Sequence, residues 1–159
     1  MDNLLKLLKN NARLSNDQLG AMLGMTEDEV TQKIKEYEES GVIMGYSTIL
    51  NDELCSNDNV TALIELKVTP AADSGFDDVA RKIMSYDEVE SVVLMSGGFD
   101  LSVTVTASSL KSVAEFVAQR LAKIDGVIPT ATHFVLKTYK DKGISVNMED
   151  KDERGLVSP

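Results

Sequence analysis

Two consecutive helix-start signals constrain the first part of this chain more than any other feature. Ser15 is followed three residues later by Gln18, and Thr26 is followed three residues later by Glu29. In each pair the hydroxyl can accept a hydrogen bond from a first-turn amide, while the second side chain reaches back to the first amide. Gly24 lies between the two signals, where the end of a helix favours a residue that tolerates positive φ. The sequence therefore predicts two helices joined by a tight turn.

The residues around this pair complete a three-helix unit over residues 1–45. Apolar residues recur at helical spacing in three successive stretches. They are Leu4, Leu5, Leu7 and Leu8 in the first, Leu19, Met22 and Leu23 in the second, and Val30, Ile34 and Tyr37 in the third. Three short helices with a tight turn are typical of a helix-turn-helix domain, in which the last helix contacts DNA bases.

On this interpretation the third helix supplies the side chains that contact DNA. Its first turn would face base edges, an amide such as that of Gln32 can pair with adenine, and lysines can hold phosphates. The candidate DNA-contacting residues are Thr26, Glu27, Thr31, Gln32, Lys33 and Lys35. Each of these residue types is also ordinary on an exposed helix, so the pattern by itself fits both a DNA-contacting face and a solvated one.

The charge of the chain limits how it can bind DNA. The formal net charge is −10, and residues 26–40 contain six carboxylates against two lysines. Binding by bulk electrostatics needs an excess of Lys and Arg, so this mode is excluded. Carboxylates in a first turn are stabilised by the helix dipole by roughly 0.3–1 kcal/mol each, which explains Glu27, Asp28 and Glu29 without a DNA role. Any DNA binding must therefore be local, and a dimer would help by linking two weak half-site contacts.

Composition narrows the class of protein further. The chain has 159 residues, of which 43% are hydrophobic, enough for one domain or two small ones with real cores. Its single cysteine, Cys55, cannot form an internal disulfide, and no apolar run is long enough to cross a bilayer. The first residues, MDNLLKLLKNN, lack the basic-then-apolar order of a signal peptide. We expect a cytoplasmic globular protein without a membrane span or a metal site.

From Val60 onward the pattern alternates between strands and helices. Strands are predicted by VTALIELKV (60–68), VESVVLM (89–95), FDLSVTVTA (99–107) and TATHFVLKTY (130–139), and helices by GFDDVARKIMSY (75–86) and SLKSVAEFVAQRLAKI (109–124). The order strand, helix, strand, strand, helix, strand predicts a ferredoxin-like βαββαβ domain, a four-stranded antiparallel sheet with both helices on one face. The fold class is thus α+β, with an N-terminal helix-turn-helix domain.

The other face of this sheet is predicted to be partly apolar. Leu63 lies on it, together with either Phe134 and Leu136 or Val135. A second subunit usually covers such a surface, so we expect a homodimer.

Four segments follow from these patterns. Residues 1–45 form the helix-turn-helix domain, and residues 46–59 a connecting strand and polar linker, with extended-type residues running from Val42 to Leu50. Residues 60–141 form the ferredoxin-like domain, and residues 142–159 a charged C-terminal tail that we expect to be mobile or loosely draped.

Three stretches together resemble the Lrp/AsnC family of transcriptional regulators. LLKLLKNNARLSNDQLGAMLGMTEDEVTQKIKEYEESGVIMGY (4–46) is similar to the family's DNA-binding half, while GGFDL (97–101) and DGVIPTATHFVLKTYK (125–140) are similar to two motifs of its sensing domain. The resemblance covers residues 1 to about 141. It implies a sequence-specific transcriptional regulator that forms dimers through its sheets, assembles further into tetramers or octamers, and responds to a bound amino acid.

The resemblance also implies where the amino acid binds. The effector loop would be Gly97, Gly98, Phe99 and Asp100, where glycines expose backbone amides to a ligand carboxylate and Asp100 can receive the ammonium group. A plain hairpin in which Asp100 caps its own turn is the alternative. The chain departs from the family pattern at Lys33 (usually Arg), Tyr37 (usually Leu) and Phe99 (usually Tyr), which bears on DNA affinity and effector identity.

Two other functions compete with this one. Haem-precursor decarboxylases resemble the same architecture, but they manage a polyacidic substrate with several histidines and arginines. This chain has one histidine, His133, and three arginines before its tail, Arg13, Arg81 and Arg120. We expect no catalytic residues and no cofactor. The acidic third helix keeps open the second alternative, a co-regulator that does not bind DNA and acts in mixed oligomers.

Overall fold

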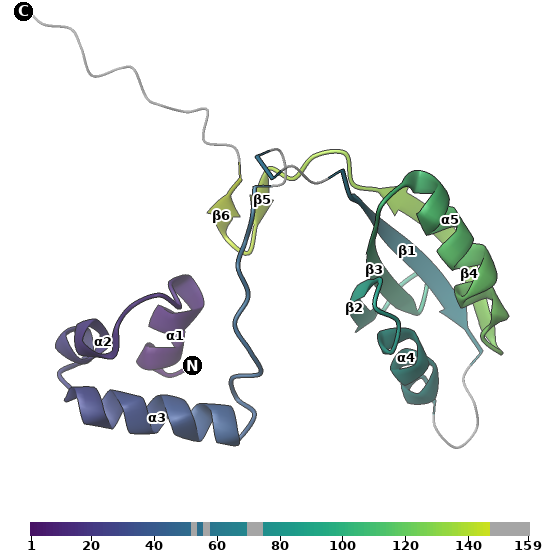
Figure 1. Ribbon diagram of the computed structural model, residues 1–159. Coiled ribbons are helices and arrows are strands. Elements are labelled where there is room, and N and C mark those ends of the chain that lie inside the picture. Colours follow the sequence, from purple (N-terminus) through teal and green to yellow (C-terminus); the bar gives the residue numbers. More distant parts are fainter. Residues whose placement is uncertain (52–53, 56–57, 70–74, 147–159) are drawn as a thin grey trace, which may run out of the picture. The chain divides into compact units, whose positions relative to one another are not determined.

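A computed structural model describes residues 1–51, 54–55, 58–69 and 75–146, and the chain divides into two compact units, Met1–Ile49 and Leu50–Pro159 (Figure 1). Each unit has its own hydrophobic core. The predicted α+β class with an N-terminal helix-turn-helix domain is confirmed.

The first unit consists of three helices, α1 (Asn3–Asn10), α2 (Asn16–Leu23) and α3 (Glu27–Glu39). Both predicted capping boxes are present. The Ser15 hydroxyl accepts a hydrogen bond from the Gln18 amide at 3.2 Å, and the Gln18 side chain accepts one from the Ser15 amide at 3.0 Å. The corresponding bonds at the start of α3 are 3.2 Å and 2.8 Å long. Gly24 ends α2 with φ of 68°, as the turn prediction requires.

The core of the helical unit is small and formed by one or two residues from each helix. Leu4, Leu8, Leu19 and Val30 are buried in it. The prediction for Met22 was wrong, because its side chain is 60% exposed and Met25 packs against the core instead. On α2 the inward line runs from Leu19 to Leu23, four residues on, which leaves Met22 on its flank.

Gly20 allows the turn after α2 to fold back closely. Its carbonyl accepts hydrogen bonds from the Gly24 and Met25 amides. A β-carbon added at Gly20 would lie 2.6 Å from the Met25 carbonyl oxygen, a distance that side chains do not tolerate. The absence of a side chain at this position therefore sets how closely the turn leading into α3 approaches α2.

The second unit is a four-stranded sheet with helices. Its elements are β1 (Val60–Val68), α4 (Asp77–Met84), β2 (Val89–Leu94), β3 (Leu101–Ala107), α5 (Leu110–Gln119), the 3₁₀ turn η1 (Leu121–Lys123) and β4 (Val127–Phe134). The strand order is β2-β3-β1-β4, and all neighbouring strands are antiparallel. This is the predicted ferredoxin-like arrangement.

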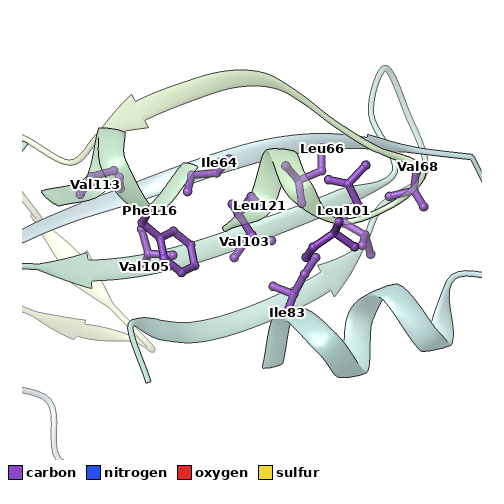
Figure 2. Packing of buried hydrophobic residues seen from close by; sticks show 13 residues of the cluster. Ile64, Leu66, Val68, Ile83, Leu101, Val103, Val105, Val113, Phe116 and Leu121 are labelled. Carbon is purple, nitrogen blue, oxygen red and sulfur yellow. The ribbon is translucent and has the colours of Figure 1, made fainter. Parts of the chain in front are cut away.

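Alternation along the two central strands creates the core of this unit. Ile64 of β1 lies opposite Val103 of β3, and both are fully buried. Figure 2 shows such strand residues gathered against Ile83 of α4 and Phe116 of α5. Full burial of a side chain of this size contributes about 1.5–3 kcal/mol. The helices are therefore held to one face of the sheet by apolar packing.

The last predicted helix and the last predicted strand differ in their details. α5 ends at Gln119 and is followed by the 3₁₀ turn. Its apolar side was predicted from the helical spacing of Leu110, Val113, Val117, Leu121 and Ile124, but Leu110 is 56% exposed, and Phe116 is buried as well. β4 ends at Phe134, which lies opposite Ala62, while His133 lies opposite Leu63. Phe134 is therefore not on the open face, and the alternative with Val135 is the one that fits the register.

The predicted strand over residues 42–50 does not form. No regular secondary structure is assigned to residues 44–51, because an extended segment needs a neighbouring strand and the described residues of this chain offer none. The predicted tail begins in a short hairpin instead, with Lys140–Asp141 (β5) paired to Ile144–Ser145 (β6). The rest of the tail, 147–159, lies outside the described residues, as do parts of the linker.

Replacing Gly20 with alanine should destabilise the helical unit. Overpacking against the Met25 carbonyl costs about 1–3 kcal/mol, whereas the gain in helix propensity is at most about 1 kcal/mol. We expect a net loss on the order of 1 kcal/mol in urea unfolding followed by circular dichroism. Gly45→Ala, where an added β-carbon meets no atom within 4 Å, is the control and should stay within about 0.5 kcal/mol. Equal stability of the two variants would contradict the close approach.

Candidate functional site

The predicted DNA-contacting side chains lie along α3, and most of them have partners inside the protein. Thr26 is the N-cap of the helix, so its hydroxyl and amide are engaged with Glu29. These hydrogen bonds lower the pKa of the Glu29 carboxyl and keep it charged. Two of the first-turn groups are therefore occupied in starting the helix. Glu27, the first residue of α3, is exposed.

Thr31 joins α3 to α2. Its hydroxyl accepts a hydrogen bond from the Asn16 side-chain amide at 2.9 Å and donates one to the Glu27 carbonyl at 2.8 Å. This contact fixes the two helices of the helix-turn-helix relative to each other. The structure thus gives Thr31 a structural role at the exposed junction of the two helices.

Gln32 and Lys35 are exposed and only loosely held. The Gln32 amide donates a hydrogen bond to Glu36 at 3.1 Å, and the Lys35 ammonium lies 3.7 Å from the Glu39 carboxylate. Both pairs are one helical turn apart, and such surface pairs contribute roughly 0.2–0.5 kcal/mol each. A phosphate or a base edge can replace partners as weak as these.

Lys33 is different, because it pairs with a residue at the start of the chain. Its ammonium lies 2.7 Å from the Asp2 carboxylate and 5.9 Å from the centre of the Tyr37 ring. Sequence reasoning missed Asp2, which is 31 residues from Lys33. The sequence could have indicated its role as an N-cap, because an aspartate directly before a helical run of leucines is typical of that position. Nothing in the sequence indicated its partner.

The pairing changes the titration of both groups. The hydrogen bond from Lys33, supported by the Leu4 amide, lowers the pKa of Asp2 from 3.8 to about 2. The same hydrogen bond raises the pKa of Lys33 above its usual range, and burial raises that of Tyr37. The pair is consequently fully charged near neutral pH.

A shallow groove of about 410 Å³ runs along α3 beside this pair. Its lining combines three carboxylates with one amide and one ammonium, namely Asp28, Glu29, Gln32, Lys33 and Glu36. The groove brings together two of the predicted DNA-contacting residues. Its three carboxylates are unfavourable for a phosphate, whereas Glu27, Thr31 and Lys35 lie outside it.

The predicted effector loop connects β2 to β3. Asp100 is tied to the end of β1, because its amide donates to the Leu66 carbonyl at 2.9 Å and its carboxylate accepts from the Val68 amide at 2.8 Å. The carboxylate of Asp100 therefore ties the loop to the neighbouring strand β1, which is neither the predicted ligand contact nor a cap of its own turn. One carboxylate oxygen makes this bond.

Gly97 and Gly98 have no conformational reason of their own to be glycine. Neither has a positive φ, and an added β-carbon would meet no atom of the described chain within 4 Å at either position. The backbone of both residues is therefore open on the side where a side chain would stand. Phe99 is half-buried beside them.

His133 lies on the open face of the sheet. Its Nε2 is 3.1 Å from the Glu65 carboxylate of β1. Among the residues that the structure describes, no group of three or more His, Cys, Asp or Glu side chains is placed to hold a metal ion. Within the same residues, every helix is too short or too polar to cross a membrane.

Comparison with known proteins matches both units. Residues 61–144 match the model of the Lrp/AsnC ligand binding domain, and residues 3–44 match a winged helix-turn-helix DNA-binding model. The chain is 41% identical to the uncharacterized HTH-type transcriptional regulator YugG of Bacillus subtilis over 98% of this chain and 95% of the relative. It is 25% identical to the leucine-responsive regulatory protein of Haemophilus influenzae over 90% of this chain and 86% of that protein.

Solved structures show the same fold. The crystal structure of a transcriptional regulator from Neisseria meningitidis in complex with L-methionine matches with a TM-score of 0.70 and 25% identity, over 89% of this chain and 93% of that one. Escherichia coli AsnC matches with a TM-score of 0.67 and 22% identity, over 91% and 97% of the two chains. The predicted family is thereby confirmed.

The Asp2–Lys33 pair predicts an acid-dependent part of the stability of the helical unit. Because folding lowers the pKa of Asp2, the pair stabilises fully above pH 3.8 and is lost as the pH falls toward about 2. Asp2→Asn keeps an N-cap oxygen but removes the charge. The melting temperature of the wild type should therefore exceed that of the variant at pH 5, and the two should converge between pH 4 and 2. A difference that does not depend on pH would contradict this assignment.

Proposed function

Because this chain belongs to the Lrp/AsnC family, we propose that it is a sequence-specific DNA-binding transcriptional regulator whose promoter affinity or oligomeric state responds to an amino acid or a related metabolite. The observation that carries the proposal is the presence of both family domains, in order, in one chain. The helix-turn-helix geometry of α2 and α3, fixed by two capping boxes, supports the DNA-binding part.

The proposed DNA contacts come from side chains of α3, of which Gln32 and Lys33 also line the groove. Glu27 can accept a hydrogen bond from a cytosine amino group, and Gln32 can pair with adenine once it leaves Glu36. Lys35, held weakly at 3.7 Å by Glu39, is the lysine most easily transferred to a phosphate. Thr26 and Thr31 set the position of the helix. Lys33 belongs to the same set but must first leave Asp2.

A homodimer is part of the proposal. The face of the sheet opposite the helices carries apolar side chains between polar ones, including the half-buried Leu63 and the 49% exposed Val93. A second copy of the chain would cover this face and hold two DNA-binding units together. Linking two weak half-site contacts raises the effective concentration of the second. Further assembly to tetramers or octamers is the arrangement that the family resemblance implies.

The amino-acid effector is proposed to bind at the loop 97–100. Its two glycines leave space for a ligand carboxylate at the backbone amides, and the second oxygen of Asp100 can accept from a ligand ammonium group. The L-methionine complex of the Neisseria regulator supports an amino acid as the class of ligand. The proposal includes no metal and no other cofactor.

A co-regulator that does not bind DNA remains the second candidate function. The observation that favours it is the acidic groove on α3, whose three carboxylates repel phosphates. Enzymatic activity is not part of the proposal, because the Bacillus subtilis and Haemophilus influenzae relatives are named as transcriptional regulators. As a regulator of transcription, the protein is proposed to act in the cytoplasm.

Lys35→Gln should weaken DNA binding through the loss of a phosphate contact. We expect lower affinity for specific and non-specific duplexes alike, and a salt dependence, log Kd against log salt, that is shallower by about 1 for each bound unit. Fluorescence anisotropy with the duplex upstream of the protein's own coding sequence measures both. Lys111→Gln is the control, since Lys111 also pairs with a glutamate four residues on at 3.7 Å but lies on α5. Equal effects of the two changes would contradict a contact by α3.

Asp100→Asn should weaken effector binding without unfolding the sheet. The asparagine carbonyl can still accept the hydrogen bond of the Val68 amide, but the charge that attracts a ligand ammonium is gone. A ligand at one hundred times its Kd stabilises the wild type by about 2.7 kcal/mol. In a thermal-shift screen of the twenty amino acids, the effector should raise the melting temperature of the wild type, and the variant should lose most of this rise. Asp125→Asn, the same change on an exposed turn, should keep it. A rise retained by Asp100→Asn would show that the effector binds elsewhere.

A further inference from the structure

We propose that Asp2 sets the DNA affinity of this protein by acting as an internal substitute for a DNA phosphate on Lys33. The inference rests on the proposed function, because it concerns the strength of DNA binding. Asp2 precedes α1 and is not one of the α3 side chains proposed to contact DNA. It acts instead through the lysine that it holds.

The geometry of Asp2 makes it a fixed partner. One carboxylate oxygen accepts from the Leu4 amide at 2.7 Å as the N-cap of α1, and the other accepts from the Lys33 ammonium at 2.7 Å. An anion at this point is also favoured by the positive end of the α1 dipole. Both oxygens are thus directed by the fold, and the carboxylate is in place before any DNA arrives.

Lys33 is held more tightly than the other lysine of α3. Its side chain and that of Asp2 are 35% and 33% exposed, whereas the side chains of the Lys35–Glu39 pair are 65% and 67% exposed and 3.7 Å apart. The Tyr37 ring near the Lys33 ammonium adds a cation–π contact. Lys35 is therefore available to a phosphate at little cost, while Lys33 has to give up a short, partly buried ion pair.

The chemical equivalence of the two partners is the reason for competition. A carboxylate and a phosphate oxygen both accept charge-assisted hydrogen bonds from an ammonium group. A lysine neutralised within the protein releases no counterion from DNA, so it adds neither affinity nor salt dependence. With Lys33 occupied, α3 offers the DNA backbone only its weakly paired lysine, Lys35, and the helical unit binds DNA less strongly than it would with both lysines available.

The test measures DNA binding of the full chain with Asp2→Asn. Asparagine retains the N-cap oxygen, so α1 should form as before, which circular dichroism checks. Release of a partly exposed ion pair should tighten binding about two- to fivefold for each bound unit. The log–log salt dependence should become steeper by about 0.9. The probe is the duplex upstream of the protein's own coding sequence, titrated at several salt concentrations by fluorescence anisotropy.

Two further variants separate Lys33 from a general charge effect. Asp17→Asn removes one negative charge from the same unit, at an exposed position in the first turn of α2, and should tighten binding less than Asp2→Asn. In a Lys33→Gln background, Asp2→Asn should have no effect beyond that of Asp17→Asn.

The outcomes distinguish this inference from the function on which it rests. If the wild type binds DNA but Asp2→Asn and Asp17→Asn behave alike, or if the gain survives in Lys33→Gln, the role of Asp2 is refuted and the DNA-binding function stands. If the wild type and every variant fail to bind at all salt concentrations, both are refuted.

Discussion

Side-chain hydrogen bonds at the helix starts are the interaction on which the helical unit depends. Its helices are only 8 to 13 residues long, a length at which isolated helices are marginal. At the start of each helix, the side chain of Asp2, Ser15 or Thr26 accepts a hydrogen bond from a backbone amide of the first turn. Two of these groups belong to reciprocal capping boxes. With a core of four buried residues, the unit relies on these caps to fix where each helix begins.

The same caps explain how an acidic helix can belong to a DNA-binding unit. Carboxylates at a helix start stabilise the helix, so Glu27, Asp28 and Glu29 are explained by local stability whether or not they contact DNA. Carboxylates at helix starts also lower the expected affinity for DNA, because Glu29 adds negative charge to the groove and Asp2 neutralises Lys33. On the proposed function, such a protein depends on shape, on a second copy and on the weakly paired Lys35, and its DNA binding should be sensitive to small changes in charge.

Much of the fold could be predicted from the sequence, and less of the candidate site. Both capping boxes, the Gly24 turn and the succession of strands and helices along the second unit were predicted, because each depends on neighbours along the chain or on simple alternation. The partners of Lys33 and Asp100 were not. The exposure of Leu110 and the burial of Phe116 on α5 were missed as well, because helical spacing does not tell which apolar side chains at the margin of a helix face reach the sheet.

The sequence by itself determined where helices and strands begin and which face of each is apolar. The physical reason is that a helix cap joins residues three positions apart, and apolar residues recur with the period of the helix or the strand. Only the tertiary structure decided which polar groups meet. Asp2 reaches Lys33 across 31 residues, and Asp100 reaches the Val68 amide across 32, because the shared core of the three helices and the pairing of the strands bring these groups together. Such pairs depend on distances between elements, which no local pattern encodes.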